Sequence, residues 1–200
     1  MLKFAESNRM KNPQVMIVKA ALLFVTIFLG VSVSKAQEWN SMISTSSNIV
    51  WQDESGKDFK ISDLQNKNLV ITMIYTTCKK TCPMLTMGKM HKIEEALVSK
   101  NKSAEFLLIT FDPTEDTVLE LAKFKKKLIR EKTAIHPDQW HILRGSEKDT
   151  HEFATKIGLG DYWKMDDHVQ HGFKITYVDQ ENSRIRTLSY NNKVVSSLFE

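Results

Sequence analysis

The sequence has few of the residues that interrupt regular structure or cross-link a chain. Its 200 residues include 7 glycines, 4 prolines and 2 cysteines, and 42% of them are hydrophobic. This composition excludes collagen-like and low-complexity chains, in which glycine or proline is far more frequent. The length suffices for one domain with an ordinary hydrophobic core and is too short for two full domains with a linker.

The body of the chain has no excess of charge of either sign. The formal net charge is +4, and residues 1–36 account for all of it with five basic side chains and one acidic side chain. Residues 37–200 therefore hold equal numbers of basic and acidic side chains. Because a protein that binds nucleic acid presents a basic surface to the phosphates, we expect no nucleic-acid partner.

The N-terminal segment lacks an apolar run of full membrane-spanning length. Residues 20–33 are uncharged and mostly apolar, and as a helix they would rise about 21 Å, against a hydrocarbon core of about 30 Å. Basic residues precede this run, and the small residues Ser34 and Ala36 follow it at the positions of a cleavage site. This order is typical of a secretory signal peptide over residues 1–36. An uncleaved anchor that also includes residues 15–18 is the alternative.

Either form of the N-terminus carries the rest of the chain out of the cytoplasm. We therefore expect an exported protein, periplasmic or anchored to the outer face of the inner membrane. Membrane contact is expected only through an uncleaved N-terminal segment. The polar, serine-rich residues 37–48 predict a loosely held lead-in, which leaves residues 49–200 for the folded domain.

Hydrophobic periodicity predicts alternating strands and helices in this domain. Residues 68–75 and 106–111 are nearly all apolar, as in buried central strands, and residues 82–100 have apolar residues at the spacing of one helix face. The other expected strands are 49–51, 59–61, 140–143, 173–178 and 184–189, and the other expected helices are 116–130, capped by Asp116, and 146–157, with a Ser-x-x-Asp start. This order predicts an α/β fold in which helices flank a central sheet of mixed direction.

Cys78 and Cys82 lie between the first buried strand and the helix that follows it. Open α/β sheets place their chemistry at such a junction, and a helix N-terminus stabilises a thiolate there. Three interpretations of the pair are a structural disulfide, a redox dithiol and a soft-metal site. The short spacing disfavours the first, because so small a loop constrains the unfolded chain little, and it does not separate the other two.

Four features of the chain follow, in order, the sequence pattern of a known family. Residues 75–83 (YTTCKKTCP) fit Y-T-x-C-x-x-x-C-P, residues 111–117 (FDPTEDT) are close to V-D-P-x-x-D-T, and residues 140–145 (WHILRG) fit W-x-x-L-x-G. His171 then precedes a hydrophobic strand. In these features, which cover roughly residues 49–190, the chain resembles the SCO (SenC) family of copper-binding, thioredoxin-fold proteins.

The resemblance implies a thioredoxin-like fold for residues 49–200 and a copper site formed by Cys78, Cys82 and His171. Thiolates suit Cu(I) and imidazole also suits Cu(II), so this donor set can hold both oxidation states. The function implied is that of a metallochaperone, which delivers copper to a cytochrome c oxidase subunit or to another copper protein.

A thiol–disulfide reductase that uses the same pair is the alternative, with Cys78 attacking, Cys82 resolving and a thiol protein as partner. A peroxide-consuming or redox-sensing thiol protein is a third hypothesis. Thioredoxin-type reductases place a cis-proline before the strand that faces the dithiol, whereas residues 138–200 contain no proline and His171 lies in that stretch. The sequence therefore favours copper binding and leaves enzymatic activity open.

Other residues near these motifs have simpler explanations. Helical spacing assigns Met84, Met87 and Met90 to one apolar stripe, with an auxiliary copper role as the weaker hypothesis. His168 fits an exposed loop better than a ligand position. Asp112 ends a strand near the expected site and turns the chain there. The alternative hypothesis is that it supports the metal ligands without binding the metal itself.

Overall fold

The structure is a computed structural model, and it describes residues 48–76, 82–164, 169–182 and 184–189. Within these ranges the side chains of residues 82, 163–164 and 169–171 are not described. The expected signal peptide or anchor, and all but the last residue of the lead-in, lie outside the described residues. Among the helices that are described, none is both long enough and apolar enough to cross a bilayer.

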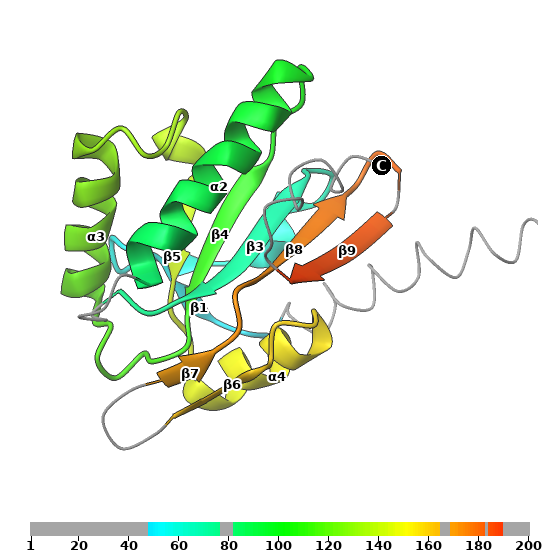
Figure 1. The fold of residues 1–200 in the computed structure, drawn as a ribbon. Coiled ribbons are helices and arrows are strands. Elements are labelled where there is room, and N and C mark those ends of the chain that lie inside the picture. Colours follow the sequence, from blue (N-terminus) through cyan, green and yellow to red (C-terminus); the bar gives the residue numbers. More distant parts are fainter. Residues whose placement is uncertain (1–47, 77–81, 165–168, 183, 190–200) are drawn as a thin grey trace, which may run out of the picture. The chain divides into compact units, whose positions relative to one another are not determined.

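A five-stranded sheet of mixed direction forms the centre of the domain, with the strand order β5-β4-β3-β8-β9 (Figure 1). Strands β3 (Leu69–Ile74), β4 (Glu105–Thr110) and β5 (Trp140–Leu143) are parallel, whereas β8 (Lys174–Asp179) and β9 (Arg184–Ser189) run antiparallel to their neighbours. Every residue of β3 and β4 is buried. Burial on both faces explains why these strands have continuous apolar sequences rather than alternating ones.

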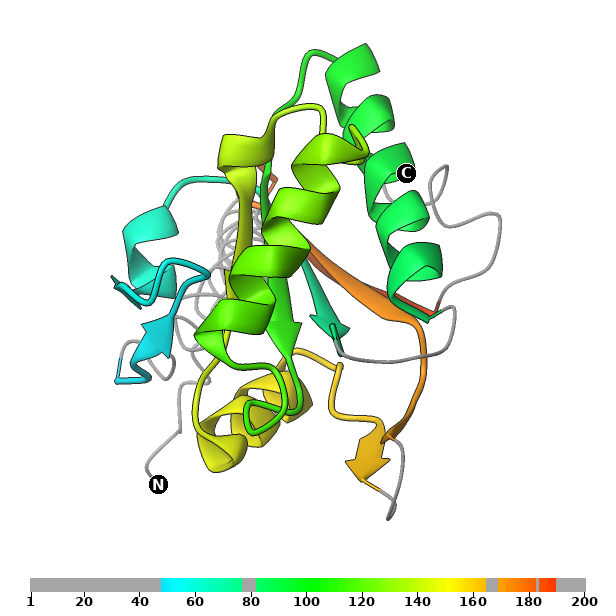
Figure 2. The same ribbon diagram turned by 90° about the vertical axis from the view of Figure 1, so that its left-hand side faces the viewer.

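Helices cover both faces of this sheet. Helices α2 (Cys82–Ser99) and α3 (Val118–Arg130) pack on one face, and α4 (Glu147–Lys156) packs on the other (Figures 1 and 2). The order of elements and the layers confirm the predicted α/β fold with a central mixed sheet.

The alternation of strand side chains produces two separate cores. In β4, Phe106 and Leu108 belong to the core under α2 and α3, whereas Leu107 and Ile109 belong to the core under α4. All four side chains are at most 1% exposed. Packing on both faces therefore holds the sheet in place. The ends of its strands have fixed positions for any site that is built on them.

Shorter elements complete the fold. They are β1 (Trp51–Gln52) paired with β2 (Asp58–Phe59), the 3₁₀ helices η1 (Ile61–Leu64) and η2 (Pro137–Gln139), and β6 (Tyr162–Lys164) paired with β7 (Val169–His171). The strand expected at residues 59–61 is therefore wrong in its second half, where η1 begins. The β6–β7 pair has no counterpart in the sequence prediction, because two strands of three residues are too short to show a period.

The helix starts agree with the sequence prediction except at α3. Ser146 caps α4 as expected, since its Oγ accepts a hydrogen bond from the backbone N–H of Asp149 at 3.0 Å. Helix α3 begins two residues later than expected, and Thr117 is its cap, with Oγ1 accepting from the N–H of Glu120. The prediction that Asp116 caps this helix is wrong, because its carboxylate is buried and bonded elsewhere.

Candidate metal centre

The first part of the candidate centre is the start of α2. Strand β3 ends at Ile74 and α2 begins at Cys82, while Cys78 lies outside the described residues. The backbone of Cys82 thus has the position at a helix N-terminus that the sequence predicts. The N–H groups and the helix dipole at this end stabilise an anionic thiolate. Pro83, in the first turn, has no N–H to leave unpaired there.

The second part is the β6–β7 hairpin, which carries His171. This histidine is the last residue of β7 and faces Tyr162 in the antiparallel register. Directly after it, the N–H of Gly172 donates to the carbonyl of Asp161 at 3.3 Å. The ammonium of Lys174 forms an ion pair with the carboxylate of the same Asp161. These contacts hold the backbone where β7 leads into β8.

Asp116 joins the end of β3 to the segment before α3. Its Oδ2 accepts hydrogen bonds from the N–H of Thr76 (2.9 Å) and from Thr110 Oγ1 (2.6 Å), and its Oδ1 accepts one from Thr76 Oγ1 (2.6 Å). Thr76 is the last described residue before the cysteine segment, two positions ahead of Cys78. Sequence reasoning missed this role, although Thr110 offered a signal: a hydroxyl that closes a buried strand needs a polar partner.

Asp112 lies in the same turn and is 2% exposed. Its N–H donates to Thr110 Oγ1 (3.1 Å), and its Oδ1 accepts from the N–H of Glu115 (3.3 Å). Its carbonyl accepts from the N–H of Asp116 at 2.9 Å. Among the described contacts, Asp112 therefore shapes the turn that presents Asp116 to the end of β3.

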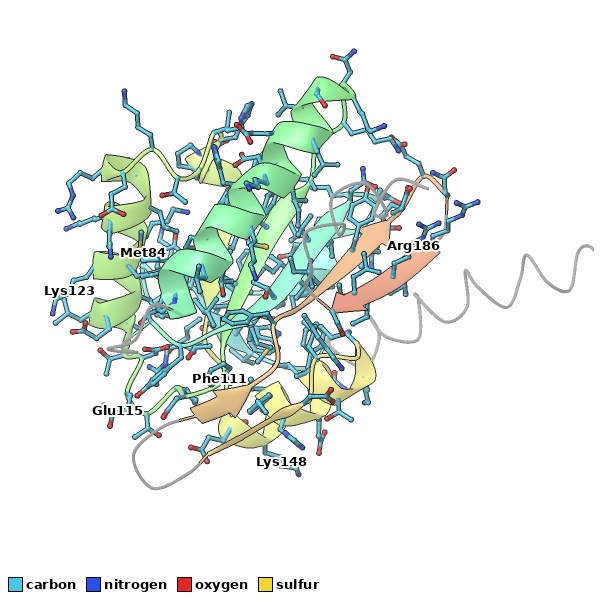
Figure 3. The ribbon with its side chains drawn as sticks, in the orientation of Figure 1. Met84, Phe111, Glu115, Lys123, Lys148 and Arg186 are labelled. Atoms are coloured by element: carbon cyan, nitrogen blue, oxygen red, sulfur yellow. The ribbon has the colours of Figure 1, made fainter. Side chains whose placement is uncertain are left out.

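A series of aromatic contacts connects the end of β3, which leads into the cysteine segment, with the β6–β7 hairpin. Tyr75 directly follows β3, and its ring centroid lies 5.8 Å from that of Phe111. Phe111, labelled in Figure 3, stacks on Tyr162 at 5.2 Å and 24°. Burial, and then the nearby Glu147 carboxylate, raise the pKa of Tyr162 to about 12. Because Tyr162 is the register partner of His171, the stack ties β7 to the end of β3.

A cation–π contact makes a second connection between the two parts. The ammonium nitrogen of Lys89 in α2 lies 4.6 Å from the ring centroid of Phe173, between β7 and β8. Burial lowers the pKa of Lys89. The helix that begins with Cys82 and the segment that follows His171 are therefore in direct contact.

Each described histidine outside β7 has a partner of its own. The pairs are His91 with Glu95, His136 with Glu94, His141 with Glu105, and His151 against the ring of Tyr162. Among the described side chains, no three of His, Cys, Asp and Glu gather closely enough to hold a metal ion. All of Cys78 and His168, and the side chains of Cys82 and His171, lie outside what the structure describes, so the ligand set stays a prediction.

The methionines of α2 do not form a single stripe. Met87 and Met90 are at most 1% exposed and pack in the core with Ile93 and Leu97. Met84 is 44% exposed in the first turn of α2 (Figure 3). The expected apolar stripe therefore begins at Met87, and Met84 is the one thioether of the three that solvent reaches.

Comparisons with known proteins place this fold in a family. The sequence matches the SCO1/SenC family model over residues 44–198. No curated protein sequence matches at a significant level. Similar solved structures include a SCO1/SenC family lipoprotein from Bacillus anthracis, at 23% identity over 74% of this chain and 87% of that one, with a TM-score of 0.62.

Two other similar structures are of Sco proteins. One is ScoI of Arabidopsis thaliana with copper bound, at 20% identity over 75% of this chain and 90% of that one (TM-score 0.59). The other is BsSco, of the Sco family of cytochrome c oxidase assembly proteins, at 22% identity over 75% of this chain and 88% of that one (TM-score 0.60). These structures confirm the thioredoxin-like fold. Since the family model spans most of the sequence, the chain belongs to the SCO1/SenC family.

Proposed function

We propose that this protein binds copper through Cys78, Cys82 and His171 and delivers it to a cytochrome c oxidase subunit or to another copper protein. The family match carries the proposal, because it spans residues 44–198 and includes all three donors. Two similar structures support it: the Arabidopsis protein holds copper, and BsSco belongs to a family of cytochrome c oxidase assembly proteins.

The donor set suits copper as a cargo. Thiolates are soft ligands that favour Cu(I), and an imidazole nitrogen also suits Cu(II). A thiol must lose its proton to bind, and the backbone position of Cys82 at the start of α2 favours the thiolate. Three donors leave room for a further ligand from a recipient protein, so copper can pass between the two proteins by ligand exchange.

The contacts around the donors support a pre-organised site. The Phe111–Tyr162 stack links β6, the partner strand of β7, to the turn after β4, and the Lys89–Phe173 contact links the segment after His171 to α2. A binding site keeps its geometry when packing and hydrogen bonds lock the elements that carry its ligands. Helix α2, which begins with Cys82, and the segment that follows His171 contact one another in this way.

Replacing His171 by Ala tests the imidazole ligand. We expect His171→Ala to weaken Cu(II) binding by at least about tenfold, a loss already typical of removing groups that only support a ligand. We also expect a change in the thiolate-to-Cu(II) charge-transfer absorption, whereas Cu(I) binding should persist through the thiolates. The matched control is His136→Ala, because His136 is half-exposed and pairs with Glu94 instead. If the spectra of His171→Ala were unchanged, the third copper ligand would be His168 or water instead of His171.

A thiol–disulfide reductase that works through the same cysteines is the second candidate function. The start of α2 favours a thiolate, which is also the reactive species in disulfide exchange. However, Gly172 and Phe173 occupy the segment before β8, where a thioredoxin-type reductase has its cis-proline. The same thiolates can serve both reactions, and the missing proline favours copper binding as the main one.

We also infer that residues 1–36 export the domain formed by residues 49–200, with residues 37–48 as a lead-in. The order of basic, apolar and small residues in the segment supports this inference. The N-terminal residue of the mature protein decides between the two forms, since a cleaved signal peptide leaves Gln37 first and an anchor leaves residues 1–36 in place.

A further inference from the structure

We propose that Asp116 is a positioning residue for the cysteine pair: its buried carboxylate holds the end of β3 in the place from which the Cys78–Cys82 segment starts. The inference rests on the proposed copper site, which it deepens by naming a residue that sets the geometry of the two sulfurs. Asp116 acts through the backbone and hydroxyl of Thr76.

The burial of Asp116 requires an explanation beyond helix capping. Asp116 is 0% exposed. Burying a carboxylate is unfavourable unless protein hydrogen bonds replace the hydrogen bonds that it makes to water. Thr76 and Thr110 supply three such bonds, and the two hydroxyl bonds are 2.6 Å long. Charge-assisted bonds of this length are among the stronger ones in proteins.

These bonds attach Thr76 to parts of the fold that are themselves fixed. The last step of the β3–β4 pairing is the bond from the N–H of Phe111 to the carbonyl of Ile74 (3.2 Å). Asp116 adds a second attachment at Thr76, two residues beyond the end of β3. The carboxylate itself is held by the turn before α3, because Thr117, the next residue, caps that helix.

The cysteine segment therefore starts from one anchored residue and ends at another. Thr76 is held by Asp116, and Cys82 is the first residue of α2. The two sulfurs belong to a short segment with both ends attached, so releasing Thr76 increases the freedom of Cys78 relative to Cys82. Greater freedom raises the entropic cost of bringing both sulfurs to one metal ion or into one disulfide.

Glu94 provides a matched control for a purely structural role. Like Asp116 it is a buried carboxylate, 2% exposed, and it accepts bonds from the N–H groups of Ile135 (2.9 Å) and His136 (2.8 Å) and from Trp140 Nε1 (3.1 Å). It lies about 18 Å along α2 from Cys82. Its removal should therefore lower stability without changing the cysteine segment.

The experiment compares Asp116→Ala, Asp116→Asn and Glu94→Ala in the full chain, under conditions where circular dichroism shows folded protein. We expect Asp116→Ala to weaken Cu(II) binding by about 10- to 100-fold. In a glutathione buffer it should shift the dithiol–disulfide equilibrium about tenfold toward the dithiol. Asp116→Asn should shift both less, because its carboxamide oxygen still accepts from Thr76. Glu94→Ala should change neither.

Wild-type copper affinity and thiol equilibrium in folded Asp116→Ala would overturn the inference. If Asp116→Ala does not fold, Asp116→Asn and Thr76→Val provide the same readouts, and unchanged values in both would overturn it equally. Failure of the proposed copper function can be distinguished from failure of the positioning role of Asp116. Absence of copper binding by the wild type, with a shifted thiol equilibrium in Asp116→Ala, would defeat the proposed function and leave the positioning role standing.

Discussion

At the scale of single residues, burial decides which of two neighbouring polar side chains does which task. Asp116 and Thr117 are both good helix caps, and the sequence alone favours the aspartate. The structure assigns the cap to Thr117, because Asp116 accepts bonds from Thr76 and Thr110. Thr76 is forty residues away in sequence, so no local pattern could have predicted this contact.

The methionines of α2 provide a stability prediction at the same scale. Met90 is 0% exposed in the core and Met84 is 44% exposed. We expect Met90→Ala to lower the free energy of unfolding by about 2–5 kcal/mol, because it leaves a cavity. Met84→Ala should change it by no more than about 0.5 kcal/mol. Urea denaturation measures both values, and equal losses would contradict the assignment of Met84 to the surface.

At the scale of elements, length determined what the sequence could predict. Strands β3 and β4 and helix α2 were predicted within one or two residues, because six to eighteen residues are enough to show a pattern. The three-residue strands β6 and β7 were missed. His171 was singled out only by resemblance to a family, and the structure adds that it ends β7 opposite Tyr162.

The packing of the β6–β7 hairpin leads to a prediction for Tyr162. A stacked aromatic pair contributes about 0.5–1.5 kcal/mol, so loss of the Phe111–Tyr162 contact should weaken Cu(II) binding by about 2- to 10-fold if the stack holds His171 in place. Tyr162→Leu removes the ring, whereas Tyr162→Phe keeps it and removes only the hydroxyl. Competition titration with a Cu(II) chelator should show a loss for the leucine variant alone. Equal affinities for the two variants would show that the stack does not position the ligand.

At the scale of the whole molecule, the sequence predicted the layers and the mixed strand directions of the sheet, but not the contacts that join distant segments around the candidate centre. Apolar patterns fix which face of a strand is buried, and they place the carboxyl end of β3 next to the start of α2. They carry no information on contacts between distant segments, such as Lys89 with Phe173. The neutral charge of residues 37–200 also implies that long-range attraction contributes little to finding a partner.

The copper content of the reduced and oxidised protein tests the central claim most directly. The full chain, with Cys78 and Cys82 either as thiols or as a disulfide, is mixed with Cu(I) and passed through a gel-filtration column, and the copper that remains is measured. We expect about one Cu(I) per chain for the dithiol form and none for the disulfide form, since a disulfide has no thiolate to offer. Copper-free dithiol protein, or full retention of copper by the disulfide form, would contradict the account.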